Sequence, residues 1–240
     1  MNLLTWNIQA GIGTGRYRDY LLHAHRQVFH TPSKIATLRS IAWAIARYDV
    51  VCLQEVDLGG RRAGWRSQAD EIAAMSGHAH VAVQENRTVP GVSRHGNAIL
   101  SHWPLQRVRD MKLPGRVAGR GCLVADVEGR RTIRVACLHL SLGAVDQGQQ
   151  LAAVAAALGD APAWAAMGDF NCGARSPALS AFCEATGGRP HPAAPLTYPS
   201  WSPRRDLDHI IGGGDLSLTH YQVEADQLSD HLPVSATVTG

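Results

Sequence analysis

The sequence has only two lysines, no C-x-x-C spacing among its five cysteines, and no apolar run long enough for a membrane helix. An odd number of scattered cysteines argues against a disulfide framework or a zinc ribbon, so we expect reduced, mostly buried thiols. The formal net charge is only +3 over 240 residues, which excludes histone-like binding and requires any polyanion contact to be local. The N-terminal residues resemble no signal segment, so we expect a cytoplasmic protein without a transmembrane segment.

The length and the hydrophobic content are those of one large domain. With 240 residues, of which 45% are hydrophobic, the chain fits a single domain over residues 1–240 better than two small ones. Periodicity predicts more strands than strict alternation of strands and helices allows, which indicates an α/β fold with mixed sheets flanked by helices. We expect strands at 2–8, 50–53, 79–85, 97–101, 105–112, 121–127, 132–140, 163–168, 207–211, 216–223 and 233–238, and helices at 33–48, 67–76, 144–158 and 177–185.

Polar side chains that can bind a metal stand where several of these apolar strands end. They are Asn7, Glu55, Asp169, Asn171, Asp208, Asp230 and His231. Strand ends are where rigid folds place functional side chains, and carboxylate and amide oxygens favour Mg²⁺, Mn²⁺ or Ca²⁺ over zinc. Asp169 and Asn171 share one face if their strand stays extended. Each residue alone also has an ordinary explanation as a turn, cap or strand-end residue.

Seven short segments add an ordered pattern. They are Trp6-Asn7, Leu53-Gln54-Glu55-Val56, the His-Gly-Asn-Ala-Ile-Leu-Ser block at 95–101, His139-Leu140, Gly168-Asp169-Phe170-Asn171, the Asp-Leu-Asp-His-Ile block at 206–210 and the Leu-Ser-Asp-His-Leu-Pro-Val block at 228–234. In this order they resemble the endonuclease/exonuclease/phosphatase superfamily, and the match covers essentially the whole chain. The 95–101 block and Tyr198-Pro199-Ser200-Trp201 are similar to small, single-domain bacterial members.

The resemblance implies a four-layer α/β/β/α sandwich of two mixed β-sheets flanked by helices. It also implies a hydrolase of phosphoric esters that uses Mg²⁺ or Mn²⁺ as cofactor. Glu55, helped by Asn7 and Asp230, is expected to hold the metal against a phosphate oxygen. Asp169 is expected to orient or deprotonate the attacking water, and Asn171 to fix the phosphate or the nucleophile.

The remaining roles concern two histidines and the phosphate. His231, oriented by Asp208, is implied to be a general base or a cationic phosphate clamp. His139 is implied to be a second donor to the phosphoryl oxygens or the leaving group, and the sequence does not rank the two histidine roles. Arg120 stands where family members often carry a phosphate-contacting arginine, with an ordinary strand-start arginine as the alternative. Asn97 either bonds within the site or is a buried turn amide.

The substrate is the open question. A nuclease needs basic and aromatic side chains around its site, and Trp201, in the long loop 187–203, is the substrate-binding candidate we would test, with a hydrophobic lid as its alternative. Further candidates are Trp65, Trp103, Arg61, Arg62, Arg66, Arg204 and Arg205. A basic cluster between residues 16 and 30 forms either a rim for polyanions or a solvated insertion.

These observations favour a phosphodiesterase acting on nucleic acid. A phospholipid head group, an inositol phosphate or another small phosphoester is the alternative substrate. A catalytically inactive binding module is a third interpretation, and the complete acidic cluster argues against it, because packed carboxylates repel unless a cation lies among them. No segment indicates an obligate protein partner.

Overall fold

The structure is a computed structural model that describes residues 1–14, 16 and 28–239. Most of the basic cluster, including Arg18, His23, His25 and Arg26, lies outside the described residues. One sheet contains, in spatial order, β10 (Ser217–Val223), β11 (Val234–Thr239), β1 (Asn2–Asn7), β2 (Val50–Asp57), β4 (Ser93–Ser101) and β3 (His80–Val89). The second contains β5 (Leu105–Lys112), β6 (Gly121–Glu128), β7 (Thr132–His139), β8 (Ala163–Asp169) and β9 (Asp208–Gly214).

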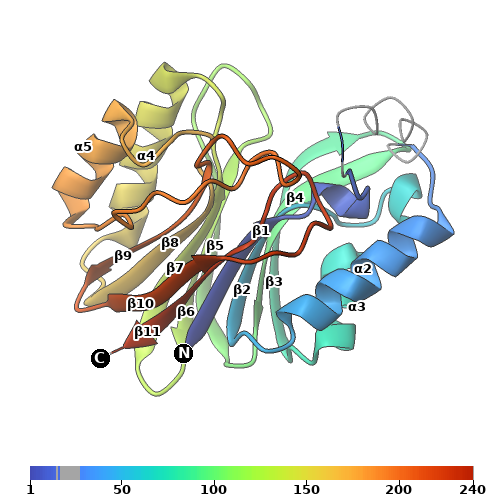
Figure 1. Cartoon of the computed structure of the whole chain (residues 1–240), viewed down its shortest axis with the longest axis horizontal. Coiled ribbons are helices and arrows are strands. Elements are labelled where there is room, and N and C mark those ends of the chain that lie inside the picture. Colours follow the sequence, from blue (N-terminus) through green and yellow to red (C-terminus); the bar gives the residue numbers. More distant parts are fainter. Residues whose placement is uncertain (15, 17–27, 240) are drawn as a thin grey trace.

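Helices cover the outer face of each sheet, so the molecule has four layers (Figure 1). The helices α2 (Pro32–Ile45) and α3 (Gln68–Ser76) pack on the first sheet, and α4 (Ala144–Leu158) and α5 (Pro177–Thr186) pack on the second. Two short 3₁₀ turns, η1 (Gln9–Gly11) and η3 (Arg61–Ala63), follow β1 and β2. The expected α/β/β/α sandwich is confirmed, and no helix among the described residues is long and apolar enough to cross a bilayer.

The central strands are buried on both faces, as their continuous apolar sequence predicts. Along β2, the side chains of Val50 and Cys52 enter the core between the sheets, whereas Val51 and Leu53 pack against the helices. This period of two places alternate residues on opposite faces of the strand. The inter-sheet core is therefore made almost entirely of strand side chains, joined by Leu216 from the turn between β9 and β10, and it fixes the ends of the strands relative to one another.

Parallel pairing brings the important strand ends together. The strands β1 and β2 are parallel, with Asn7 paired to Gln54, and β7 and β8 are parallel, with His139 paired to Asp169. The antiparallel strand β9 begins beside the end of β8, where Asp208 pairs with Asp169. The residues that follow these strands consequently lie at one end of the sandwich.

The hairpin of β3 and β4 and the start of helix α2 differ from the boundaries predicted from the sequence. The hairpin of β3 and β4 extends beyond the predicted 79–85 and 97–101, because its outer residues are polar and carry no apolar alternation. Its turn is closed by a hydrogen bond from Val92 N to Val89 O across Pro90-Gly91, and Gly91 has a φ of 68°, as a Pro-Gly turn requires. Helix α2 begins at Pro32 after Thr31, because proline is favoured in the first helical turn.

The inter-sheet core should dominate stability. Leu123→Ala on β6 removes a side chain that is fully buried between the sheets, and we expect a loss of about 2–5 kcal/mol in the free energy of unfolding. Leu196→Ala removes a side chain that is 45% exposed in the long loop, and it should change stability by less than about 0.5 kcal/mol. Urea denaturation of the two variants checks this, and equal losses would contradict the assignment of the core.

Candidate active site

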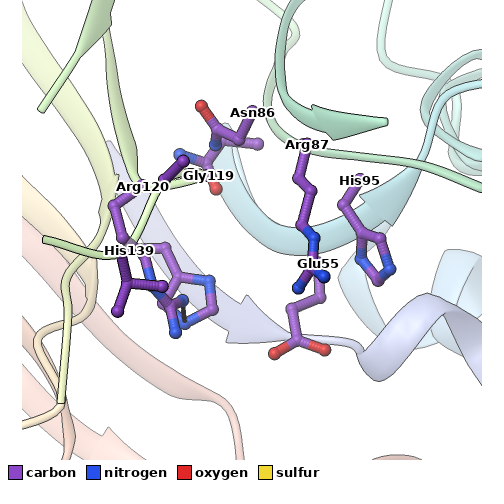
Figure 2. A pocket seen from close by; sticks show the side chains of 11 residues that line it. Glu55, Asn86, Arg87, His95, Gly119, Arg120 and His139 are labelled. Atoms are coloured by element: carbon purple, nitrogen blue, oxygen red, sulfur yellow. Dashed lines mark hydrogen bonds between the residues drawn. The ribbon is translucent and has the colours of Figure 1, made fainter. Parts of the chain in front are cut away.

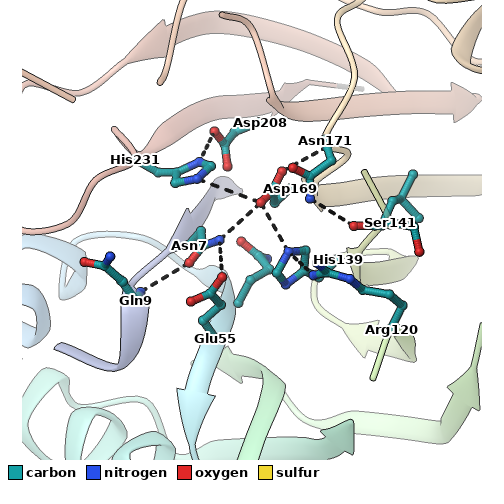
Figure 3. Close-up of polar contacts among 12 residues, drawn as sticks. Asn7, Gln9, Glu55, Arg120, His139, Ser141, Asp169, Asn171, Asp208 and His231 are labelled. Carbon is teal, nitrogen blue, oxygen red and sulfur yellow. Dashed lines mark hydrogen bonds and ion pairs between the residues drawn. The ribbon is translucent and has the colours of Figure 1, made fainter. Parts of the chain in front are cut away.

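Asp169, the last residue of β8, is the centre of the polar contacts at this end of the sandwich (Figure 3). The side-chain amide of Asn7 donates to Asp169 Oδ2 at 3.1 Å and to Glu55 Oε1 at 3.3 Å. Asp169 Oδ2 also lies 3.4 Å from His139 Nε2 and 3.9 Å from His231 Nε2. Side chains from β1, β7 and the segment before β11 therefore converge on one carboxylate, and Asn7 connects it to Glu55 on β2.

The backbone around Asp169 departs from the extended strand that the sequence suggested. Asn171 has a φ of 53°, so it does not share a strand face with Asp169. Its backbone N–H instead donates to Asp169 Oδ1 at 2.9 Å, and its side-chain amide donates to Leu140 O at 2.9 Å. Gly168 is required here, since a Cβ on it would lie 2.0 Å from Leu138 O on β7.

His231 and Asp208 form a buried pair on one side of Asp169. Asp208 Oδ2 is 2.8 Å from His231 Nδ1, and it also accepts a hydrogen bond from the Thr197 hydroxyl at 2.6 Å. Burial acts to lower the pKa of His231, but the negative charges of Asp208 and Asp169 outweigh it and raise the pKa well above the ordinary value. His231 is therefore a cation near neutral pH, and its orientation is fixed by Asp208.

Asp169 has a pKa suited to accepting a proton. Burial raises the pKa of its carboxyl to about 7, with the positive charge of His231 acting in the opposite direction and the negative charge of Asp208 adding to the rise. The hydrogen bonds from Asn171 N and from Asn7 stabilise the ionised form. A carboxyl group whose pKa lies near the working pH can take a proton and release it again.

His139, on the other side of Asp169, has the opposite character. A guanidinium only donates hydrogen bonds, so the contact between Arg120 Nη1 and His139 Nε2 makes that ring nitrogen an acceptor. Burial, followed by the positive charges of Arg120 and His231, lowers the pKa of His139 well below its ordinary value. The ring is therefore neutral, and Arg120 supplies the positive charge on this side.

Glu55 and Asp230 supply the hard oxygen atoms that a divalent ion prefers. Burial raises the pKa of Glu55, the nearby charge of Asp230 raises it further, and the hydrogen bond from Asn7 opposes both. Asp230 is held by Gln9 Nε2 at 3.3 Å and by the Ser229 hydroxyl at 3.1 Å. Two carboxylates that repel each other in a partly desolvated position fit a cation between them.

Asp169, Asp208 and His231 also have potential ligand atoms within 4.8 Å of one another. In the metal-free protein the raised pKa of His231 favours the protonated imidazole, which has no lone pair for a metal. Asp208 Oδ2 is shared between His231 and Thr197. Glu55 and Asp230, with Asn7 beside them, are the oxygen donors that could hold Mg²⁺ or Mn²⁺ without displacing that proton.

The three residues expected to bind substrate have different surroundings. Arg120 lies in the centre through its contact with His139. Asn97 lines a pocket together with Glu55 and His139, but its amide also donates to Gln84 Oε1 and Gly121 O, which ties the two sheets together. Trp201 is half-buried in the long loop, next to Ser200, whose N–H donates to Asp230 O.

Two of the further substrate-binding candidates do not lie on the surface around the site. Arg62 is buried in an ion pair with Asp57 at 2.5 Å, and Trp103 packs against the inter-sheet core at the opposite end of the strands, beside Met1. Sequence reasoning also missed Gln9 and Thr197, which hold Asp230 and Asp208. Thr197 stands directly before the Tyr-Pro-Ser-Trp segment, so that motif was the signal for it.

The sequence and the fold were compared with those of known proteins. The sequence matches the model of the Endonuclease/Exonuclease/phosphatase family over residues 4–231, and the chain therefore belongs to this family. No curated protein matches the sequence.

Several solved structures share the fold. An endonuclease/exonuclease/phosphatase from Beutenbergia cavernae is 21% identical with a TM-score of 0.76, covering 98% of this chain and 70% of its own. A family protein from Leptotrichia buccalis is 16% identical with a TM-score of 0.77, covering 100% of both chains. A mannosyl-6-phosphatase from Bacteroides thetaiotaomicron is 13% identical with a TM-score of 0.76, also covering 100% of both chains.

The pair of His231 and Asp208 can be tested by titration. In metal-free protein we expect the pKa of His231, followed by NMR of the imidazole, to lie above about 6.5 in the native sequence. It should fall below that value in Asp208→Asn, because the main charge that opposes burial is removed. Asp160→Asn, an exposed change before β8, should leave the His231 titration unchanged.

An unaltered titration in Asp208→Asn would contradict this description of the pair. The raised pKa also has a consequence for stability, because the folded protein binds the proton more tightly than the unfolded chain. The stabilisation by His231 is fully present below about pH 6.5 and is lost as the pH rises through the raised pKa.

Proposed function

We propose that this protein is a Mg²⁺- or Mn²⁺-dependent phosphodiesterase that cleaves nucleic acid by attack of water on phosphorus. Membership of the family supports hydrolysis of a phosphoric ester. The single observation that carries the proposal is the convergence of Asn7, His139 and His231 on the buried carboxyl of Asp169. Burial raises the pKa of this carboxyl to about 7. Phosphodiesters are anions, so hydroxide attack meets charge repulsion unless positive groups surround the phosphate.

The metal-holding residues are Glu55 and Asp230, with Asn7 positioned beside them. When bound, the ion supplies a Lewis acid that offsets the negative charge developing on the phosphoryl oxygens. Asn7 donates to both Glu55 and Asp169, so it couples the orientation of the metal-holding carboxylate to that of the proposed base. This coupling keeps the attacking water and the phosphate in a fixed relation.

Two side chains of the protein accept and donate the protons of the reaction. Asp169 takes a proton from the attacking water, held in orientation by the Asn171 N–H and the Asn7 amide. His231, protonated and oriented by Asp208, donates to a phosphoryl oxygen or to the departing oxygen. Arg120, in contact with the neutral His139, supplies a permanent charge on the opposite side of the phosphate.

An exposed basic and aromatic patch favours nucleic acid as the substrate. We call it the rim patch, and it consists of Phe29, Arg61, Trp65 and Arg66. The guanidinium of Arg61 lies 5.2 Å from the centre of the Phe29 ring, and Trp65 is 67% exposed. Arg62 connects this loop to the site, because its guanidinium contacts His95, which lines the pocket beside Glu55. Bases stack on such exposed rings, and arginines track the backbone.

A small phosphoester is the second candidate. The pocket beside Glu55 has a volume of about 160 Å³, which is below the usual range for a whole ligand of drug size. One structural neighbour is a mannosyl-6-phosphatase, so the fold carries activity on a phosphorylated sugar in another protein. An inactive binding module is disfavoured by the chain's complete set of acidic and imidazole groups.

The metal requirement can be tested with bis-p-nitrophenyl phosphate. Hydrolysis should require added Mg²⁺ or Mn²⁺ and stop with EDTA, and Glu55→Gln should lower kcat/KM by at least about 10²-fold, because a metal-holding carboxylate is lost. The matched control is Glu128→Gln, at the exposed end of β6 away from the site, which should retain native activity. Metal-independent hydrolysis, or an active Glu55→Gln enzyme, would refute the proposed mechanism.

The nucleic-acid substrate can be tested at the rim patch. Trp65→Ala should raise KM for a single-stranded oligonucleotide by about 5- to 100-fold, because stacking of one base contributes about 1–3 kcal/mol. KM for bis-p-nitrophenyl phosphate, which is too short to span the patch and the site, should rise much less. Trp43→Ala removes another exposed tryptophan, on α2, and serves as the control. Equal effects of both variants would remove the role of the rim patch.

A further inference from the structure

A small pocket opens directly beside the candidate active site (Figure 2). It has a volume of about 160 Å³, and Glu55 and His139 belong both to its lining and to the catalytic contacts. Its remaining polar lining includes Asn86, Arg87 and His95 from the hairpin of β3 and β4. The proposed hydrolysis of one phosphate uses none of these three side chains, so they require another explanation.

A β-bulge in the hairpin of β3 and β4 positions these side chains at the pocket. The pairing of β3 with β4 shifts between Glu85 and Arg87, which leaves Asn86 without a paired residue on β4. Such a bulge re-aims the neighbouring side chains. The extended hairpin, closed by its Pro-Gly turn, carries the bulge past the apolar core to the end of the sandwich where the strand ends meet (Figure 1).

Arg87 is a cation at this pocket that has no anionic partner of its own. Among the described residues it forms no ion pair. The aliphatic part of the Arg87 side chain lies against the loop before β6. A Cβ placed on Gly119 of that loop would be only 3.0 Å from Arg87 Cβ. Arg120 follows Gly119 and lines the same pocket. Two guanidinium groups therefore border one small volume, and this group prefers the planar, bidentate recognition of phosphate or carboxylate.

His95 adds a neutral donor to the pocket. Its Nδ1 lies 3.1 Å from Arg62 Nη2 and must accept that hydrogen bond, because arginine only donates. Burial, followed by the charge of Arg62, lowers the pKa of His95 to about 4, so the neutral ring carries its proton on Nε2. Asn97 adds a buried acceptor, since its Oδ1 has no partner among the described residues, and a hydroxyl or a water can satisfy it.

We propose that this pocket binds a second phosphate of the substrate, next to the phosphate that is cleaved. The inference rests on the proposed function and narrows its substrate class to phosphodiesters that carry a further phosphate. The pocket offers a charged group of the substrate the guanidinium groups of Arg87 and Arg120. In nucleic acid that group is either a terminal phosphate or the next phosphate along the strand.

Short thymidine oligonucleotides separate these sources. The probes are dTpdT, which has one phosphate, its 5′- and 3′-phosphorylated forms, and dTpdTpdT. We expect at least one probe with a second phosphate to exceed dTpdT in kcat/KM by about 10-fold or more, because a charged hydrogen bond to that phosphate adds binding energy that dTpdT lacks. Preference for a phosphorylated dinucleotide over dTpdTpdT assigns a terminal phosphate, and the reverse assigns a neighbouring one.

Arg87→Ala should reduce this preference to less than about 2-fold. Arg39→Ala, an exposed arginine on α2, is the matched control and should retain it. If the native enzyme hydrolyses all four probes at similar rates, or if Arg87→Ala keeps the native preference, the pocket does not bind a second phosphate.

A binding measurement distinguishes failure of this inference from failure of the proposed function. Calorimetry with inorganic phosphate in EDTA should show binding to the native protein and to Arg39→Ala, and at least about 5-fold weaker binding to Arg87→Ala. If this difference is found but no probe is hydrolysed with Mg²⁺ or Mn²⁺, the pocket is retained and the proposed function fails. If hydrolysis is found without this difference in binding, the pocket assignment fails and the proposed function stands.

Discussion

The end of the sandwich is governed by the burial of carboxylates close to one another. Asp169 and Asp208 face each other in the register of β8 and β9, and the charge of Asp230 reaches Glu55. Desolvation and like charge both disfavour the ionised forms, so each carboxylate needs a donor or a cation. The chain supplies His231 to Asp208 and the Asn7 amide to Glu55 and Asp169. The proposed metal ion would supply the remaining positive charge, between Glu55 and Asp230.

The same charge distribution makes the two histidines different. His231 lies against Asp208 and near Asp169, so its pKa rises, whereas His139 contacts Arg120 and its pKa falls. Both rings are buried, and desolvation lowers both pKa values; the charges of Asp208 and Asp169 reverse this effect at His231, whereas Arg120 adds to it at His139. A cationic ring therefore lies on one side of Asp169 and a neutral ring on the other. Because only the cationic ring carries a proton to give, we assign proton donation to His231.

The sequence predicted much of this architecture because the relevant signals are local. The apolar run at Val50–Leu53 identified a strand buried on both faces, although β2 continues to Asp57 and so contains Glu55. The predicted ends of β1 and β8 placed Asn7 and Asp169 where the structure has them. Protonation states could not be predicted in this way, since they depend on Arg120 and Asp208, which other strands bring to the histidines. The hairpin extension was missed because Asn86 and Arg87 lie beyond the core, where no apolar periodicity marks a strand.

Several buried polar atoms at this same end have no partner. Among the described residues they include Gln9 Oε1, Asn86 Oδ1, Asn97 Oδ1 and Asp208 Oδ1. Each such atom costs about 1–3 kcal/mol in a folded protein unless water or a ligand satisfies it. The apolar side chains of the inter-sheet core offset this cost. The unsatisfied groups near Asp169 prepare this end of the sandwich for a polar ligand, because binding a ligand satisfies those groups.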